Sequence, residues 1–405
     1  MKLIYNRIIG GGKIMILGGG QAQIELIKTA KSMGLYTIVV GVAGDYPGYK
    51  IADKCYFVNI FNKEDVLRIA KEEQIDGISM VCSDFGLETI GYVNDALGLS
   101  GVSEKAAKCS SNKYSMKHQL KANGINTADF RIVHDDEEVE VACKELKFPL
   151  IVKAVDLQGS RGIYICKTPS DVLCNYRKSI SESRQDYCIV EEFIQGNEFG
   201  AQAFVYHGEV LFVQAHGDIV WNSGKTNIPV GHYMPYTKDE IFNATVNDLV
   251  CRAIKAMDFD NCAVNVDLIL KDNIPYIIEM TGRAGANFLP ELTSTYLGMN
   301  YYEMVLKTAL GESAKKYFNQ RLSGKPCVLT RQLFSDKDGL VEEIGYENMP
   351  NIRKIVFFVE KGDKVKKFTD SRDCIGKVLC VGDTLEQCKS DVNEFLKKKF
   401  KFILV

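Results

Sequence analysis

The sequence predicts an α/β protein that begins with a helix-covered parallel sheet, continues as a larger α+β region and closes with a smaller α+β segment. Two observations support this fold class. Apolar runs alternate with amphipathic stretches over the first ~110 residues, and after Cys109 the pattern changes to the alternation that antiparallel strands show. The 405 residues are also enough for two or three domains of roughly 100–200 residues each.

The N-terminal region has the pattern of repeated strand–helix units. Residues 13–18, 36–42 and 75–82 are predicted strands, and residues 23–34, 63–74 and 87–98 are predicted helices, two of them ended by Gly34 and Gly98. Repeated β-α units of this kind predict a parallel sheet with helices on both faces.

The glycine-rich turn after the first strand raises the question of a dinucleotide cofactor. Gly18 and Gly20 fit the fingerprint of such a site, but Gln23 stands where the third glycine or alanine belongs. The second strand ends with Gly41 where a ribose-binding acid is expected, and Asp45 comes too late. A phosphate could still bind at that helix N-terminus. The sequence therefore disfavours NAD or FAD, and an oxidoreductase stays a minor alternative.

The middle of the chain mixes helices with antiparallel strands. A helix is expected over residues 110–124, capped by Ser110 or Ser111 and stopped at Gly124. Strands are expected at 149–155, 161–167 and 187–194, a helix from Pro169, antiparallel strands over 198–220 and a helix over 248–258. Residues 262–280 are predicted to form a hairpin with its turn at 271–273.

Charged residues interrupt these apolar strands at a few positions. Lys153 lies within the run "PLIVKAV", where a buried ammonium is costly unless it faces an anion, and Lys113 stands early in the preceding helix. The Gly/Ser loop "DLQGSRG" at residues 156–162 could expose backbone N–H groups to phosphate.

Acidic residues form the other half of the pattern. Asp267 and Glu279 both lie within otherwise apolar strands of the predicted hairpin, where two carboxylates repel unless a cation or protons neutralise them. Oxygen ligands of this kind suit Mg²⁺ with bound phosphate, and Arg283 follows where a further cation could reach the same group. A third acidic stretch, "VEEFIQGNE", ends the strand at residues 187–194.

This order of lysines, glycine-rich loop, Glu-Glu pair, Asp and Glu resembles the ATP-grasp superfamily. The resemblance covers nearly the whole chain. It implies a Rossmann-like preATP-grasp domain at residues 1–110, a two-lobed α+β ATP-grasp domain at 111–324 with its lid lobe at about 125–195, and a small C-terminal α+β domain at 325–405.

The resemblance also implies a role for each matching residue. Lys113 and Lys153 would bind the phosphates of ATP, and a mobile loop with Gln158, Gly159, Ser160 and Gly162 would close over them. Glu191 and the backbone near Phe193 and Ile194 would bind adenine, and Glu198 would bind the ribose. Asp267 and Glu279 would hold Mg²⁺, with Mn²⁺ as an alternative, and Arg283 would contact the transferred phosphate, so that Arg283 and Lys153 are the expected catalytic pair.

The stretch "EMTGRAGANFLPEL" is most similar to that of the L-amino-acid ligases and related carboxylate–amine ligases. Many members carry Asn two residues after the metal-binding Glu, whereas this chain has Thr281, which leaves a second metal ion open. Residues 215–236, with Trp221 and His232, are expected to form a substrate-facing loop. Arg283 and Asn287 are candidates for holding the acceptor carboxylate.

The resemblance implies an ATP- and Mg²⁺-dependent ligase that activates a small carboxylate as an acyl phosphate and joins it to an amine, an amino acid or another small metabolite, releasing ADP and phosphate. Two alternatives of other classes are a bicarbonate-using ATP-grasp carboxylase and a non-catalytic ATP sensor. A homodimer is the default expectation for the assembly.

Composition excludes several other classes. The net charge of −2 gives no field that would attract nucleic acid, and no apolar stretch is long enough to cross a bilayer. The N-terminus lacks the features of an export signal. Thirteen scattered cysteines without a Cys-x-x-Cys pair predict reduced thiols in a cytoplasmic protein, and the spacing of the five histidines predicts no zinc site.

Overall fold

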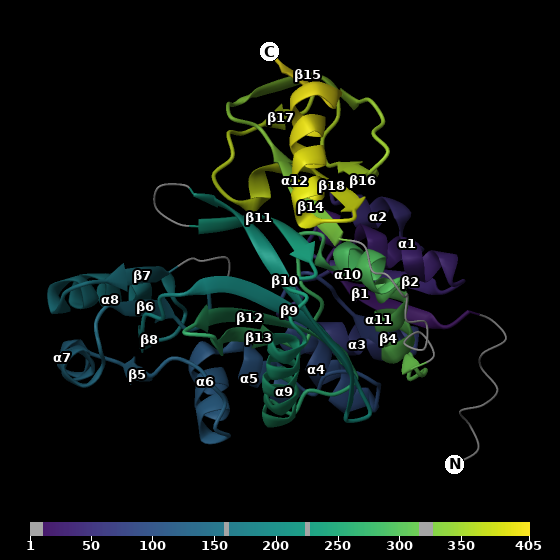
Figure 1. Ribbon diagram of the computed structural model, residues 1–405. Coiled ribbons are helices and arrows are strands. Elements are labelled where there is room, and N and C mark those ends of the chain that lie inside the picture. The colour runs from purple at the N-terminus through teal and green to yellow at the C-terminus, as the bar shows by residue number, and fades with distance from the viewer. Residues whose placement is uncertain (1–10, 158–161, 223–226, 316–326) are drawn as a thin grey trace.

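The computed structural model describes residues 11–157, 162–222, 227–315 and 327–405 (Figure 1). A parallel sheet near the N-terminus, a lid lobe that projects to one side and a C-terminal region at the top surround one long central sheet. This arrangement confirms the predicted α/β class. All thirteen cysteines are free thiols. Within the described ranges, no helix combines the length and apolarity needed to span a membrane.

The N-terminal sheet has the strand order β3-β2-β1-β4, and its pairs are parallel, as predicted. Its buried strands carry apolar side chains toward helices on both faces. The sequence analysis missed β3 and α2, which are short and partly polar. The elements are β1 (Lys13–Leu17), η1 (Gln21–Gln23), α1 (Ile24–Ser32), β2 (Tyr36–Gly41), α2 (Pro47–Ile51), β3 (Lys54–Phe57), α3 (Lys63–Glu73), β4 (Gly77–Ser79) and α4 (Leu87–Leu97).

The glycine-rich turn after β1 is filled by the protein itself. A Cβ at Gly19 would lie 2.6 Å from the Tyr49 ring, and one at Gly41 would lie 2.6 Å from the Tyr49 hydroxyl. Gln23 is buried, and its side-chain amide donates to the Val81 carbonyl at 2.6 Å and accepts from the Val81 N–H at 3.2 Å. Gln23 therefore ties the start of the helix to the end of β4, which explains why a glycine is absent here.

The lid lobe is a separate four-stranded antiparallel sheet with the order β5-β8-β6-β7 and two helices on it (Figure 1). Its core is distinct from that of the N-terminal domain. The elements are β5 (Phe130–Val133), α7 (Asp136–Glu145), β6 (Leu150–Ala154), β7 (Ile163–Cys166), α8 (Pro169–Glu182) and β8 (Cys188–Glu192).

Two helices, α5 (Glu104–Ser111) and α6 (Lys113–Ala122), lead into this lobe. The predicted cap of the second helix was wrong. Ser110 and Ser111 belong to α5, and the side chain of Asn112 caps α6 by accepting from the Ser115 N–H at 3.0 Å. Asn is as good an N-cap as Ser, so the sequence pattern alone did not separate them.

The central sheet has eight strands in the order β13-β12-β9-β10-β11-β14-β18-β16. It crosses the predicted domain boundary at residue 325, because β11 pairs with β14. Its members are β9 (Asn197–Tyr206), β10 (Glu209–Asn222), β11 (Asn227–Met234), β12 (Cys262–Lys271), β13 (Ile274–Thr281), β14 (Cys327–Phe334), β16 (Ile352–Phe357) and β18 (Cys374–Gly382).

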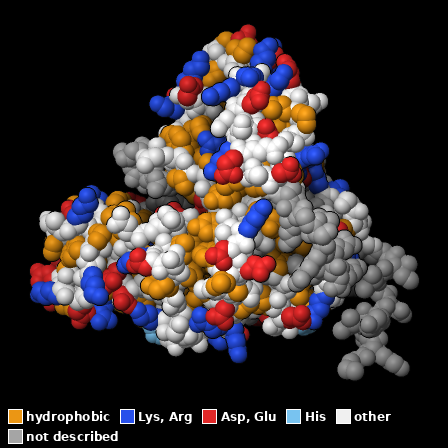
Figure 2. Space-filling view, viewed as in Figure 1, with side chains coloured by type: hydrophobic (Ala, Val, Ile, Leu, Met, Phe, Trp, Pro, Cys, Tyr) orange, Lys and Arg blue, Asp and Glu red, His pale blue; other side chains and the backbone are white. Residues whose placement is uncertain are grey.

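The remaining elements cover this sheet or form a small sheet at the C-terminal end, of order β17-β15-β19. They are α9 (Glu240–Ala256), α10 (Leu289–Leu297), α11 (Tyr301–Ala309), β15 (Gly339–Tyr346), β17 (Lys364–Val365), η3 (Ser371–Asp373), α12 (Leu385–Glu394), η4 (Phe395–Lys399) and β19 (Phe400–Leu404). Figure 2 shows basic and acidic side chains interspersed over the face in view, in keeping with the near-neutral net charge.

We predict that Gln23→Leu lowers the thermal midpoint of the protein, because the N–H and C=O of Val81 lose their buried partner. Each buried polar group left unpaired costs about 1–3 kcal/mol. The control is Gln21→Leu, since Gln21 lies in the same short helix but is exposed. Equal midpoints for the two variants, measured by circular dichroism, would contradict the assignment.

Candidate functional site

A row of polar side chains runs across one face of the central sheet. Glu279 on β13 lies opposite Asp267 on β12, Asp267 opposite Gly200 on β9, and Gly200 opposite His216 on β10. Directly opposed residues of antiparallel strands point to the same face. The acid pair and His216 therefore share one face, with the glycine between them.

The same face continues toward the C-terminal region. Asp218, two residues after His216, lies opposite His232 on β11, and His232 lies opposite Thr330 on β14. Two residues further along β14, Gln332 lies opposite Lys377 on β18. Acids therefore stand at one end of this face, imidazoles in the middle and a lysine toward the other end.

The acid pair has the chemistry of a divalent-cation site. The pairing of β12 with β13 shifts register directly after Asp267, which marks a local β-bulge at this position. The Asp267 side chain is open to solvent, yet the surrounding protein and the carboxylates of Glu279 and Asp218 raise the pKa of Asp267 to about 7. A cation between the two carboxylates would relieve this repulsion, and their oxygens fit Mg²⁺.

A chain of buried amides orients Asp267. The Asn265 side chain donates to the Asp267 carboxylate at 3.1 Å, the Gln202 amide donates to the Asn265 oxygen at 2.6 Å, and the Gly285 N–H donates to Gln202 at 3.0 Å. A Cβ at Gly285 would lie 2.4 Å from the Asn265 oxygen, so only glycine fits there. The loop after β13 thereby fixes the rotamer of a predicted metal ligand.

Lys113 connects the acid pair to the lid lobe. Its ammonium lies 3.6 Å from the Glu279 carboxylate and donates to the Leu157 carbonyl at 2.6 Å. Leu157 is the last described residue before the predicted phosphate loop. Gln158, Gly159 and Ser160 lie outside the described residues. Gly162, just after them, has a φ of 62° and accepts from the Ala154 N–H.

Lys153 and Glu191 meet in the lid lobe, where the structure adds a lysine that the sequence analysis missed. The Glu191 carboxylate lies 2.9 Å from Lys153 and 2.9 Å from Lys117, and all three side chains are buried. Burial and the charge of Lys153 lower the pKa of Lys117, whereas the two ammonium groups hold the pKa of Glu191 below its usual range against the effect of burial. Lys117 lies one turn after Lys113, a spacing that could have revealed it.

Of the groups predicted to contact adenine, a carboxylate oxygen of Glu191 is available to a base and the Phe193 N–H is not. One carboxylate oxygen of Glu191 is buried without a partner among the described residues and could accept from an exocyclic amine. The Phe193 N–H donates to the Pro149 carbonyl at 2.9 Å, so it is not available to a base. Ile194 packs against Ile269 of the central sheet. Glu198, the predicted ribose ligand, is an exposed residue, yet the partial desolvation of its carboxyl by the surrounding protein and the charge of Asp218 raise the pKa of that carboxyl.

Arg283 is held by a partner from the N-terminal domain. Asp84, in the loop after β4, accepts two bonds from the guanidinium at 2.5 and 2.8 Å. Thr281, found where the sequence analysis expects an Asn in many ATP-grasp members, donates its hydroxyl proton to the same carboxylate at 2.9 Å. Asp84 was missed, although an acid at the carboxyl end of a parallel strand is where sites of α/β proteins gather.

The predicted substrate-facing loop is mostly strand. Residues 215–222 belong to β10 and 227–234 to β11, so the expectation of a loop was wrong. The glycines of this stretch suggested a loop, but its polar and apolar residues alternate as those of a strand do. Trp221 packs on Phe368 and Phe334 of the C-terminal region, with ring centroids 5.0 and 6.4 Å apart. His232 lies on the polar face.

Asn287 and Phe288 follow the loop that carries Arg283, and both have left-handed backbone, with φ of 57° and 69°. Two consecutive non-glycine residues in this conformation are strained, and such strain is concentrated at functional sites. The Phe288 ring lies near two lysines of the C-terminal region, with the Lys377 and Lys354 ammonium groups 5.1 and 5.9 Å from its centroid.

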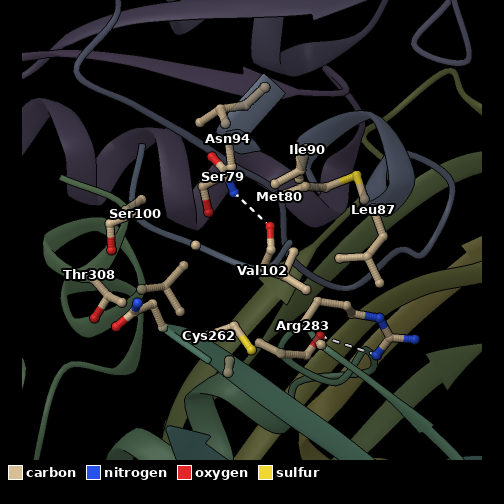
Figure 3. A pocket seen from close by; sticks show the side chains of 18 of the residues that line it. Ser79, Met80, Leu87, Ile90, Asn94, Ser100, Val102, Cys262, Arg283 and Thr308 are labelled. Atoms are coloured by element: carbon tan, nitrogen blue, oxygen red, sulfur yellow. Dashed lines mark hydrogen bonds between the residues drawn. The ribbon is translucent and has the colours of Figure 1, made fainter. Parts of the chain in front are cut away.

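Figure 3 shows a pocket where α4 meets the start of the Arg283 loop, with Leu87, Ile90 and Asn94 on one side and Arg283 at its edge. The cavity measures about 40 Å³, which is room for a few water molecules only. The pocket is a domain junction and is too small for a nucleotide.

The comparison with solved structures decides the family. The chain is 38% identical to a phosphoribosylglycinamide synthetase from Anaerococcus prevotii, and the match covers 98% of this chain and 100% of that one with a TM-score of 0.86. The chain belongs to the ATP-grasp superfamily.

Two family profiles agree with this ATP-grasp assignment. Residues 111–287 match the ATP-grasp (A) domain of phosphoribosylglycinamide synthetase, and residues 331–398 match L-amino acid ligase C-terminal domain 2. The L-amino acid ligase from Bacillus licheniformis shares the fold at 21% identity, with a TM-score of 0.82 over 98% of this chain and 99% of that one.

A curated relative is the formate-dependent phosphoribosylglycinamide formyltransferase of Methanocella arvoryzae, 24% identical over 194 residues, or 48% of this chain and 46% of the relative. The matched region spans about half the length of the first curated relatives.

We predict that Glu191→Gln destabilises the ATP-grasp protein far more than Glu192→Gln. The first change leaves two buried ammonium groups without a counter-charge, a loss that typically costs about 3–5 kcal/mol. The second removes a charge that accepts one bond, from the Lys147 N–H at 3.0 Å, which a glutamine oxygen can still accept. Thermal midpoints of the two variants test this, and similar values would show that Glu191 is not buried between the lysines.

Proposed function

We propose that the chain is an ATP- and Mg²⁺-dependent carboxylate–amine ligase that forms an acyl phosphate and transfers its acyl group to an amine. The observation that carries the proposal is the opposed pair Asp267 and Glu279, with Lys113 3.6 Å from Glu279 and Arg283 fixed nearby by Asp84. Family membership supports it, since the similar proteins include a phosphoribosylglycinamide synthetase and an L-amino acid ligase.

The side chains have separate roles in this proposal. Lys113 and Lys153 bind the phosphates of ATP. Asp267 and Glu279 hold Mg²⁺, which neutralises charge on the triphosphate, and Mn²⁺ is expected to be able to take the place of Mg²⁺. A substrate carboxylate attacks the γ-phosphorus, and ADP leaves. An amine then attacks the acyl carbon of the acyl phosphate, and inorganic phosphate leaves as the amide forms. No protein nucleophile is required.

Arg283 acts as a positioned cation in this scheme. Its guanidinium forms a bidentate pair with Asp84, so its direction is fixed before substrate arrives. The η nitrogen that donates to the Ala284 carbonyl at 3.2 Å makes the weaker contact, and we expect it to exchange this contact for one with the transferred phosphate while Asp84 keeps the guanidinium in place.

The acceptor is proposed to be an amine that also carries an anionic group. The far end of the polar face offers Lys377 and Lys354, whose ammonium groups lie 5.1 and 5.9 Å from the Phe288 ring. Lys354 pairs with Glu25 of α1 at 2.7 Å, so N-terminal and C-terminal regions meet there. Asn287, which directly precedes Phe288, is the proposed further contact at this end, where the carboxylate of an amino acid or a phosphate would find cations. A homodimer stays the expected assembly.

The test is a screen of carboxylates crossed with amines, read as release of ADP and phosphate. The proposal predicts release that depends on both substrates, and hydroxylamine in place of the amine should trap the acyl group as a hydroxamate. Release driven by bicarbonate without any amine would instead identify a carboxylase. ATP binding without turnover for any pair would indicate a sensor and contradict the proposal.

We predict that Lys153→Ala and Glu279→Ala fold and lose about 10²–10³-fold in turnover, because each removes a charged contact worth ~2.7–4 kcal/mol in the transition state. Glu386→Ala, an exposed acid on α12, is the matched control and should keep full activity. Near wild-type ATP consumption by either site variant, with normal circular dichroism, would overturn the site assignment.

A further inference from the structure

Three side chains of the central sheet form a cluster that the proposed ligase chemistry does not use. His216 and Asp218 are two residues apart on β10, and His232 lies opposite Asp218 on β11. Both strands have neighbours on either side in the sheet, so the cluster stands on a rigid part of the structure.

The spacing of the donor atoms fits a single small cation. The Asp218 carboxylate oxygen lies 2.6 Å from the His232 Nδ1 and 3.2 Å from the His216 Nδ1, and one donor atom from each residue lies within 4.8 Å of the others. Ligands about 2.0 Å from a tetrahedral zinc ion are roughly 3.3 Å apart. Small side-chain movements would bring the three donors to that geometry.

The imidazoles are buried and incompletely paired. His216 is 2% and His232 4% exposed. Among the described residues, neither ring nitrogen of His216 has a hydrogen-bond partner of acceptable geometry, and the Nε2 of His232 has none either. Buried polar groups without partners are rare in folded proteins, and they often mark the place where an ion or a water molecule binds.

The site also has a charge that needs compensation. Asp218 is largely buried, and although burial raises its pKa, the adjacent His232 and His216 hold the pKa of Asp218 well below its usual range. Gly200 makes room for the cluster, because a Cβ there would lie 2.4 Å from the His216 ring. The His216 ring is two strands from Asp267, or about 10 Å at the usual strand spacing.

We propose that His216, Asp218 and His232 bind one divalent transition-metal ion of the zinc class, at a site separate from the Mg²⁺ pair. Two imidazoles and one carboxylate select such an ion over Mg²⁺, which prefers oxygen ligands alone. Three protein ligands leave a coordination position open for water or an anionic group of a substrate. The spacing His-x-Asp on a strand, which places both on one face, was the signal that the sequence analysis did not use.

The experiment is titration of the chelator-treated 405-residue chain with Zn²⁺ in excess Mg²⁺, by calorimetry and by competition with a chromophoric chelator. One ion per chain is expected to bind. His216→Gln, His232→Gln and Asp218→Asn should each weaken Zn²⁺ binding more than about 100-fold, because mutating even a residue that only hydrogen-bonds to a metal ligand typically lowers metal affinity about 10–100-fold. His207→Gln, at the exposed turn between β9 and β10, is the matched control and should bind as the wild type does.

Two further measurements keep the result independent of the variants' stability and of the ligase proposal. Co²⁺ added to the wild-type chain should give the visible absorption of a four- or five-coordinate nitrogen and oxygen site. Glu279→Gln should retain Zn²⁺ stoichiometry, whatever happens to turnover. The absence of both tight Zn²⁺ binding and the Co²⁺ spectrum in the wild type would overturn the proposal, as would binding that is lost only with Glu279.

Discussion

Asp267 and Glu279 repel each other, because the pairing of β12 with β13 places them directly opposite on the same face. The hairpin that holds them is tight. Its turn consists of Asp272 and Asn273, which both have positive φ, as this kind of two-residue turn requires. The sequence analysis also included Lys271 in the turn, but Lys271 still belongs to β12. The rest of the site balances this concentration of negative charge with cations from other parts of the chain.

Those cations come from different regions, and each is held in place by a neighbour. Lys113 from α6 reaches Glu279, Arg283 is fixed by Asp84 of the N-terminal domain, and Lys153 of the lid lobe shares Glu191 with Lys117. Since these contacts join three regions, the domain arrangement and the electrostatics depend on each other. A small apolar contact between Ile194 and Ile269 joins the lid lobe to the central sheet beside them.

The sequence predicted what depends on local pattern. Charged residues within apolar strands drew attention to Lys153, Asp267 and Glu279, whose roles stay predictions. The absence of a third glycine at position 23 argued against a dinucleotide site, and in the structure the Gln23 side chain bonds the backbone of Val81. Partners set by distant pairing could not be found in this way. Asp84 meets Arg283 from 199 residues away, and although its place after a parallel strand marks it as a candidate, no local pattern shows which residue it pairs with.

The polar face of the central sheet was equally hidden from the sequence. Its residues come from strands that are adjacent only after the sheet has formed, so its register could not be known in advance. Trp221 illustrates the converse error, because an aromatic side chain in a stretch rich in glycine suggested a substrate contact, whereas it packs on Phe368.

In the proposed ligase, the nucleotide binds between the lid lobe and the β12–β13 hairpin, and the glycine-rich turn after β1 is scaffold. A crystal structure with a non-hydrolysable ATP analogue and Mg²⁺ tests this most directly. The account predicts electron density for the metal at Asp267 and Glu279, and for the triphosphate beside Lys113 and Lys153. A triphosphate bound at Gly18–Gly20, with Tyr49 displaced from Gly19, would contradict it.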